Sequence, residues 1–304
     1  LRDDRDIDPQ YFDYDEVTST LQSIQTSYPA IAQRYELGTT AENRKIWGLK
    51  ISDNVQVQEE EPEVLVIGLH EAREIMSTEI AMDMAQYLTS NYGSDPDVTN
   101  WVNTWQIWIV PMMNPDGSAY CWSTDQYWIK NRNDLGGDVY GVALGHNYPT
   151  DWGACFGSSS DPNSNGYRGA TAGSEAETQA ILTLADNHKF MAVVSYHSFN
   201  EFVLYPYGCT GETAPEFGIL SSFASSVGSQ IQKEDNSYGY QTGAWWEVLY
   251  ANDGNETDYF YANQGSMAIA VEVNAESYYP SYSTRNSTVN RNRAGWQKVL
   301  DLYE

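Results

Sequence analysis

One short stretch of this sequence gathers side chains that could bind a metal ion. The segment "GLHEAREIMSTE", residues 68–79, places His70, Glu71, Arg73 and Glu74 directly after a strand-like apolar run. Imidazole nitrogens and carboxylate oxygens are common zinc ligands in proteins. Each of these residues alone is more simply explained as a hydrogen-bonded polar group at a strand end. The stretch therefore needs partners from elsewhere in the chain before it predicts a metal site.

Two further apolar runs supply such partners. The run at 190–196 ends at His197 and Ser198, and the run at 267–271 is followed by Glu272. Because ligands of α/β sheets bind at the carboxyl edge of the strands, we expect these side chains to approach the first stretch. Histidine and carboxylate ligands with a separate carboxylate base are the equipment of zinc-assisted hydrolysis.

The elements that would position these residues alternate between strands and helices. Nearly continuous apolar runs predict strands buried on both faces at 45–51, 63–69, 105–113, 190–199 and 267–273. Helical periodicity predicts helices at 15–28, 77–91, 174–187, 214–232 and 288–303, with Ser77 or Thr78 as the N-cap of the second. This alternation favours one α/β domain over residues 1–304. Residues 114–173 are rich in Gly, Ser, Asn and Asp, which predicts functional loops.

Many phrases in order give a family resemblance. They include "YDEVTSTLQSIQTSYP", "EARE", "VPMMNPDGSAYCWSTDQYW", "HNYPTDWGACFGSS", "YRGATAGSEAET", "SYHSFNEFVLYPYG", "LYANDGNETDYFYANQG" and "AIAVEV". With these phrases the chain resembles the zinc carboxypeptidases of the carboxypeptidase A and T family over nearly its whole length. The resemblance implies a mixed, mostly parallel, twisted sheet of eight strands with helices on both faces.

The resemblance also implies a metal site, with one ligand position changed. In the family phrase H-A-R-E the His and the Glu bind zinc, and alignment on "ARE" puts Glu71 at the histidine position. Glu74 and His197 match the other two ligands, so the implied set is Glu71, Glu74 and His197. His70 then matches a non-ligand histidine. An alternative places His70 on the metal through a bulge, which is needed because neighbouring strand residues point to opposite faces.

Three catalytic positions of the family are retained. Arg73 matches an arginine that contacts substrate, Tyr250 matches a mobile tyrosine that closes over it, and Glu272 matches the general base. We therefore assign these three residues as the catalytic candidates.

Two positively charged positions of the family are lost. Ile129 stands where the family has the arginine that stabilises the oxyanion, and Gly145-His146 replaces the Asn-Arg pair that holds the terminal carboxylate of the substrate. Losing one oxyanion donor typically lowers the rate by ~10²–10³, and a histidine ring cannot copy the bidentate fork of an arginine. His146, Asn147 and Ser198 are the remaining candidates for contacting substrate.

Three hypotheses of function follow. The first is a carboxypeptidase-fold protein with an eroded site, non-catalytic or weakly active, that acts as a binding or structural protein. The second is an active zinc peptidase with a Glu/Glu/His site and an amidated, branched or cell-wall peptide as substrate. The third is self-assembly into a homo-oligomer or polymer through contacts rich in Tyr, Trp and Asn.

Composition narrows the possible partners. The chain has 42 acidic and 16 basic residues in 304, a formal charge of −26. Phosphate groups would be repelled, so nucleic acid and anionic membranes are disfavoured as partners, while a peptide or protein ligand is compatible. No apolar run reaches 18 residues, which predicts no membrane span. Together with a start at Leu1 without Met, the acidity favours a processed, secreted, extracellular protein.

Cysteines and acidic loops give weaker signals. Cys121, Cys155 and Cys209 match no zinc-binding pattern; one disulfide and one spare thiol are expected, with the pairing left open. The segments "DDRDID" (3–8) and "DLGGD" (134–138) could bind calcium, but they lack the alternating ligands of an EF-hand and are better interpreted as solvated loops.

Overall fold

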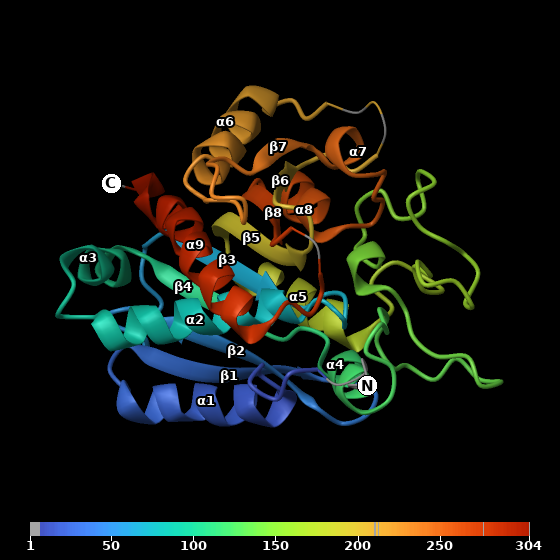
Figure 1. The fold of residues 1–304 in the computed structure, drawn as a ribbon, viewed down its shortest axis with the longest axis horizontal. Helices are drawn as coiled ribbons and strands as arrows, with labels where there is room; N and C mark the ends of the chain where they lie inside the picture. Colours follow the sequence, from blue (N-terminus) through green and yellow to red (C-terminus); the bar gives the residue numbers. More distant parts are fainter. Residues whose placement is uncertain (1–6, 210, 212, 276, 304) are drawn as a thin grey trace.

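The strands assemble into one eight-stranded sheet in the computed structural model, which describes residues 7–209, 211, 213–275 and 277–303 (Figure 1). The strands are β1 (Ala32–Thr39), β2 (Lys45–Ile51), β3 (Glu63–Gly68), β4 (Gln106–Val110), β5 (Phe190–Ser198), β6 (Phe202–Tyr205), β7 (Gln241–Ala244) and β8 (Met267–Val273). Their order across the sheet is β1-β2-β4-β3-β5-β8-β6-β7. The pairs β3–β4, β3–β5, β5–β8 and β6–β7 are parallel, and β1–β2, β2–β4 and β6–β8 are antiparallel. The predicted mixed, mostly parallel sheet is confirmed.

Alternation along the central strands explains why helices cover both faces. In β3, Val64 and Val66 face one buried core, whereas Leu65 and Ile67 face another. The first core is closed by α1 (Tyr14–Ser27), α2 (Ile75–Asn91), α3 (Pro96–Thr104), α6 (Phe217–Gly228) and α9 (Tyr282–Leu300). The second is closed by α5 (Ala176–Asn187) and by the segment that contains α8 (Glu256–Tyr259) and the helical turn Phe260–Gln264.

The five predicted strands and five predicted helices are all present; β2 and β8 have the predicted ends, and the ends of the others are shifted. The predicted N-cap of α2 is wrong: the helix begins at Ile75, and Ser77 lies in its first turn. The Ser77 hydroxyl instead accepts from the Leu69 N–H at 2.8 Å and donates to the Glu74 carbonyl at 2.6 Å. Ser77 therefore joins the end of β3 to the start of α2. The sequence patterns do not predict the strands β1, β6 and β7, the helix α3, or the short helices α4 (Pro115–Ser123), α7 (Trp245–Val248) and α8.

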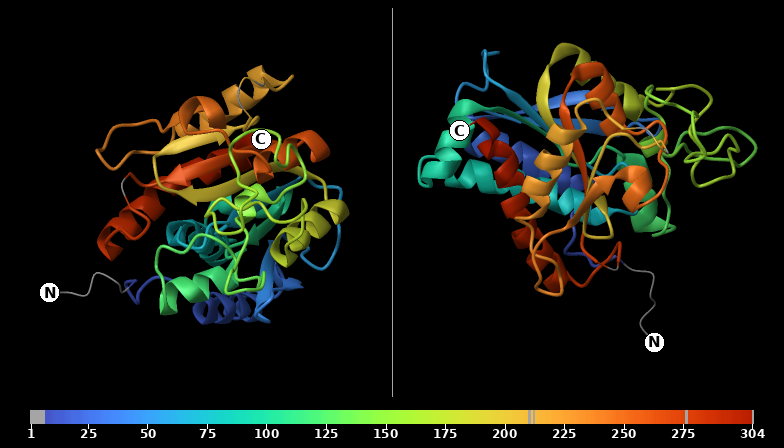
Figure 2. Two further views of the ribbon diagram at one scale, coloured as in Figure 1. Left: turned by 90° about the vertical axis from the view of Figure 1, so that its right-hand side faces the viewer. Right: turned by 90° about the horizontal axis from the view of Figure 1, so that it is seen from above.

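The connection between α4 and α5 consists of long loops and one helical turn, Leu144–His146. Its ribbon lies at the right-hand end of the molecule in Figure 1 and in the right-hand view of Figure 2, and it faces the viewer in the left-hand view of Figure 2. Backbone hydrogen bonds hold it against the chain that follows β3, including Ala72 N–H to Ile129 C=O at 2.9 Å. The disulfide Cys155–Cys209 joins it to the loop after β6, and Cys121 is free and buried. The predicted loop thus borders the carboxyl end of the central strands.

Within the described part of the chain, no helix combines the length and the apolar character needed to cross a membrane.

Candidate functional site

The site is centred on the imidazole ring of His197 at the end of β5. Its Nδ1 lies 2.9 Å from Glu74 Oε2, and its Nε2 lies 3.1 Å from Glu256 Oε1. Both carboxylates and the ring are buried. His197 is therefore held by an acidic side chain at each of its two nitrogens.

These two edges of the ring define two sides of the site. The outer side, next to Nδ1, contains Glu71, Glu74 and Glu272, of which Glu272 is the register partner of His197 on β8. The Glu71 side chain is 22% exposed. The inner side, next to Nε2, contains His70, Ser195 and Glu256, none of which reaches solvent.

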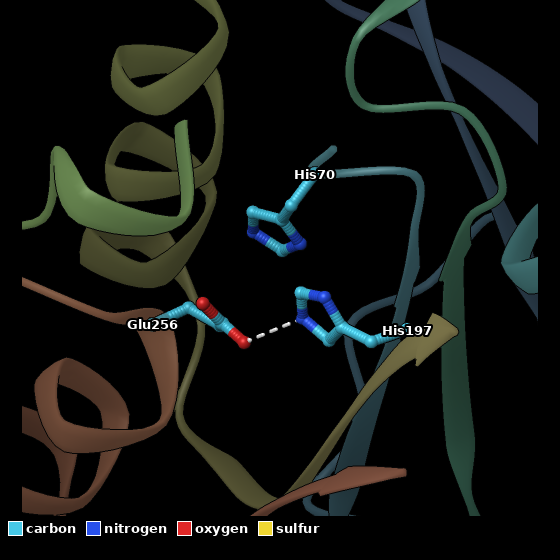
Figure 3. A group of neighbouring side chains, drawn as sticks. All are labelled: His70, His197 and Glu256. Atoms are coloured by element: carbon cyan, nitrogen blue, oxygen red, sulfur yellow. Dashed lines mark hydrogen bonds and ion pairs between the residues drawn. The ribbon is translucent and has the colours of Figure 1, made fainter. Parts of the chain in front are cut away.

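On the inner side, two imidazole rings lie side by side (Figure 3). The rings of His70 and His197 stack with centroids 5.5 Å apart and an interplanar angle of 16°. Ser195 Oγ lies 3.3 Å from His70 Nδ1 and 3.0 Å from His197 Nε2. The remaining nitrogen of His70, Nε2, lies 2.9 Å from the Tyr148 hydroxyl. Every ring nitrogen on this side therefore faces a polar atom.

Local backbone conformation produces this arrangement. Leu69 has a φ of 61°, a left-handed conformation that L side chains rarely adopt. The turn redirects the chain after β3, so that His70 lies inside while Glu71 approaches Arg73 near the surface. Glu256 is positioned separately: it is the first residue of α8, whose N-cap Asn255 accepts a hydrogen bond from the Asp258 N–H.

The carboxyl groups of the outer side lie close together, and few positively charged groups lie near them. Burial raises the pKa of Glu74 to about 7, and the charge of Glu71 adds to this rise. Burial, followed by the charge of Glu74, raises the pKa of Glu272 well above its ordinary value. The outer side therefore carries an excess of acidic groups.

The inner side has the opposite electrostatic pattern. Burial lowers the pKa of His70 to about 4. Burial acts to raise the pKa of Glu256, but the neighbouring histidines lower it to about 2. Burial would likewise lower the pKa of His197, yet Glu74 and Glu256 together raise it well above its ordinary value. Glu256 is thus the acid of the site that stays ionised most readily.

The predicted catalytic residues lie around the outer side. Arg73 Nη2 lies 3.4 Å from Glu71 Oε2, and the guanidinium carbon is 4.1 Å from the centre of the Tyr278 ring. Tyr250 is 50% exposed, in the loop after α7. Glu272 is buried beside Glu74.

Two of the three predicted substrate-binding residues, His146 and Asn147, are engaged elsewhere. His146 Nδ1 lies 3.0 Å from the Asp253 carbonyl oxygen. Asn147 is fully buried, donates to the Arg168 carbonyl at 2.8 Å and accepts from the Glu175 N–H, so it holds the loop in place. Ser198 is also buried, with a hydroxyl that has no partner.

A comparison with protein families identifies the chain. The sequence profile of the family described as zinc carboxypeptidases matches residues 17–295. The chain belongs to the zinc carboxypeptidase family. Carboxypeptidase A2 of Rattus norvegicus is 28% identical over 272 residues, which cover 88% of this chain and 64% of that protein. Metallocarboxypeptidase A of Trichophyton rubrum is 30% identical over 254 residues, or 82% of this chain and 60% of that protein. The chain therefore spans less than two thirds of the length of these curated relatives.

Solved structures of carboxypeptidases share the fold. Carboxypeptidase A from Helicoverpa armigera superposes with a TM-score of 0.85 at 25% identity, covering 95% of this chain and 72% of that one. Bovine thrombin-activatable fibrinolysis inhibitor, in complex with tick carboxypeptidase inhibitor, gives a TM-score of 0.86 at 23% identity, with 96% of this chain and 97% of that one covered.

The three ligand positions implied by the family are not gathered as one group of ligand atoms within 4.8 Å of one another among the described residues. Glu71 turns its carboxylate to Arg73, and Glu74 lies at hydrogen-bonding distance from His197 Nδ1. Within the described residues, a three-residue group with ligand atoms within 4.8 Å of one another near this site consists of His70, His197 and Glu256. A second such group in the described part of the chain is Asp53, Glu59 and Glu61, in the loop before β3. We therefore derive no catalytic step through a zinc ion on the outer side.

The calcium predictions gain no support. The segment 134–138 contributes to neither of these groups. Most of the segment 3–8 lies outside the described residues.

Sequence reasoning missed Glu256, Ser195 and Tyr148, and it placed His70 second to Glu71. The sequence offers one signal for Glu256. It directly follows Asn255, a residue type typical of helix N-caps, and the short segment after it contains aromatic residues. Nothing in its spacing to His197 indicates that the two side chains meet.

Proposed function

We propose that this chain is a non-hydrolytic member of the zinc carboxypeptidase family that binds polypeptide segments at the outer side of the site. The observation that carries the proposal is the pair of carboxylates at the two nitrogens of His197. Hydrolytic zinc needs three protein ligands and an open position for water. Here Nδ1 faces a hydrogen-bonded carboxylate and the first ligand position carries Glu71 in an ion pair.

The substituted positions support the same conclusion. Ile129 has no donor for an oxyanion, and the ring of His146 is held by a backbone carbonyl. The family reaction uses a positive group to hold the terminal carboxylate of the substrate. Arg73 pairs with Glu71 and lies over the ring of Tyr278. One guanidinium cannot replace both positive groups that the family has at the positions of Ile129 and His146.

Charge indicates which ligands the outer side would take. Glu71, Glu74 and Glu272 face one ion-paired arginine, in a chain with a formal charge of −26. A lysine- or arginine-containing segment would pair with Glu71 and would favour the ionised forms of Glu74 and Glu272, whose pKa values are raised, whereas a free carboxyl terminus would be repelled by the ionised carboxylates. The ligand class we propose is therefore a basic peptide segment, with the half-exposed Tyr250 beside it.

The test combines hydrolysis and binding. Blocked peptides with a free carboxyl terminus are incubated with the zinc-supplemented protein, and release of the terminal residue is measured. We expect no release, and tighter calorimetric binding of a short amidated lysine peptide than of its glutamate counterpart. Zinc-dependent release that disappears in Glu272→Ala would overturn the proposal and establish the active-peptidase alternative.

Secretion and self-assembly remain predictions. The Cys155–Cys209 disulfide supports secretion, because disulfides persist in oxidising compartments. Size-exclusion chromatography with light scattering tests assembly, and a strictly monomeric chain would remove it.

A further inference from the structure

The inner side of His197 has the donor set of a zinc site, built from His197 and from two residues, His70 and Glu256, outside the ligand positions that the family resemblance implies. Two imidazoles and one carboxylate, from His70, His197 and Glu256, have ligand atoms within 4.8 Å of one another (Figure 3). They come from three separate elements: the turn after β3, the end of β5 and the start of α8. Two nitrogens and one carboxylate oxygen suit zinc, whereas calcium and magnesium require mainly oxygen ligands.

The second nitrogen of each ring has the partner that a metal-binding histidine needs. His197 Nδ1 faces the Glu74 carboxylate at 2.9 Å, and His70 Nε2 faces the Tyr148 hydroxyl at 2.9 Å. Such partners orient the ring and leave the other nitrogen free for the metal. Those other nitrogens are His197 Nε2 and His70 Nδ1, and both lie near Ser195 Oγ. The orientation of both rings is therefore set by contacts outside the three-ligand group.

We propose that His70, His197 and Glu256 bind one zinc ion in a closed site on the inner side of His197, with Glu74 and Tyr148 as positioning residues. The ion replaces the Nε2 proton that His197 otherwise shares with Glu256. Ser195 Oγ is the nearest further oxygen for a fourth ligand. Because all of these groups are buried, no position is open to substrate, so the ion joins β3, β5 and α8 and performs no hydrolysis.

The test is metal binding by the whole chain, measured separately from any activity. Chelator-treated protein is titrated with zinc, and bound zinc is quantified by mass spectrometry after dialysis. We expect one zinc per chain, an affinity weakened by about tenfold or more in Tyr148→Phe, and loss of stoichiometric zinc in Glu256→Gln and His70→Asn. The matched control Glu71→Gln, a change of the same kind on the outer side, is expected to keep full zinc content.

A second measurement covers the case in which the inner variants fail to fold. Crystals of the unaltered protein grown with zinc are measured at the zinc absorption edge, and the anomalous peak locates the ion. A peak between His70 and Glu256 supports the proposal. A peak between Glu71 and Glu74, zinc lost only in Glu71→Gln, or no zinc bound to the unaltered chain would each overturn it. The last result would leave the proposed peptide-binding function standing, because that function needs no metal.

Discussion

The outer and inner sides of His197 contain similar numbers of titratable groups but differ in how these groups are compensated. On the outer side, burial raises the pKa of Glu74 and of Glu272, and the neighbouring acidic side chains add to both shifts. On the inner side, Glu256 lies beside two histidines, which lower its pKa to about 2. The difference teaches that one histidine ring has crowded carboxyls at its Nδ1 edge and a compensated histidine–carboxylate cluster at its Nε2 edge. A single ring separates a mostly buried acidic cluster, in which Glu71 is partly exposed, from a closed polar core.

Removing the shared ring is expected to have the largest effect. In His197→Ala, Glu74 and Glu256 lose their common partner and remain buried. Breaking a buried pair by deleting one member typically costs about 3–5 kcal/mol. Urea unfolding of metal-free protein should show a loss of free energy of unfolding in this range. A loss below about 1 kcal/mol would mean that the two carboxylates are compensated by other groups.

The free energy of unfolding should depend on pH, because several buried acids have raised pKa values in the folded chain. In the folded state the pKa of Glu74 is raised to about 7, that of Glu177 to about 7 and that of Asp258 to about 8. At pH values between the unfolded pKa and the raised folded pKa of these acids, the folded chain binds more protons than the unfolded chain. The free energy of unfolding therefore falls as pH rises from about 5 to 8. Each titrating group contributes roughly 1.4 kcal/mol per pH unit of its shift.

Glu256 acts at the acidic end of the same profile. Its folded pKa of about 2 lies below the unfolded value, so the stability it contributes is present above about pH 4.5 and is lost as pH falls towards 2. Urea midpoints measured from pH 3 to 8 should therefore pass through a maximum near pH 5. In Glu256→Gln the decline on the acidic side should be smaller. Stability that rises steadily to pH 8 would contradict the raised pKa values of Glu74, Glu177 and Asp258, and an unchanged acidic decline in Glu256→Gln would contradict the lowered pKa of Glu256.

Tyr148→Phe is expected to cause a smaller loss of stability, through a change on the inner side. It removes the hydroxyl next to His70 Nε2 and leaves that buried nitrogen without its partner. A buried group left unsatisfied costs about 1–3 kcal/mol. Thermal and urea unfolding of metal-free protein measure this loss. The matched control Tyr127→Phe, at an exposed ring, should be neutral.

Glu71→Gln is expected to have the smallest effect on stability. Its ion pair with Arg73 is partly exposed, and such pairs contribute about 0–1 kcal/mol. Binding of the lysine peptide should weaken several-fold, because one of three acidic groups is removed, and the difference should shrink at high salt. Equal binding by the variant and the unaltered protein at low salt would place the peptide elsewhere.

The scaffold was largely predictable because its central strands are apolar runs that are buried on both faces. β6 and β7 escaped prediction because each has four residues, and the β7 sequence "QTGA" has no apolar run. The sequence placed Glu74, His197 and Glu272 in one site, and the structure brings them together. It could not show which edge of His197 each acid meets, since that depends on the turn at Leu69 and on the position of α8. Glu256 was missed for the same reason.

The N-cap of α8 has a consequence for producing the protein. Asn255-Glu256-Thr257 and Asn286-Ser287-Thr288 are both acceptor sequences for N-linked sugars. Asn286 is exposed on α9. Asn255 is fully buried, and its Nδ2, the atom that would carry the sugar, donates to the Asn252 carbonyl at 2.6 Å. A sugar attached to Asn255 before folding would prevent α8 from packing in its native place and would keep Glu256 from reaching His197. In a glycosylating host, folded chains should therefore carry their sugar on Asn286, and chains modified at Asn255 should be retained as misfolded material.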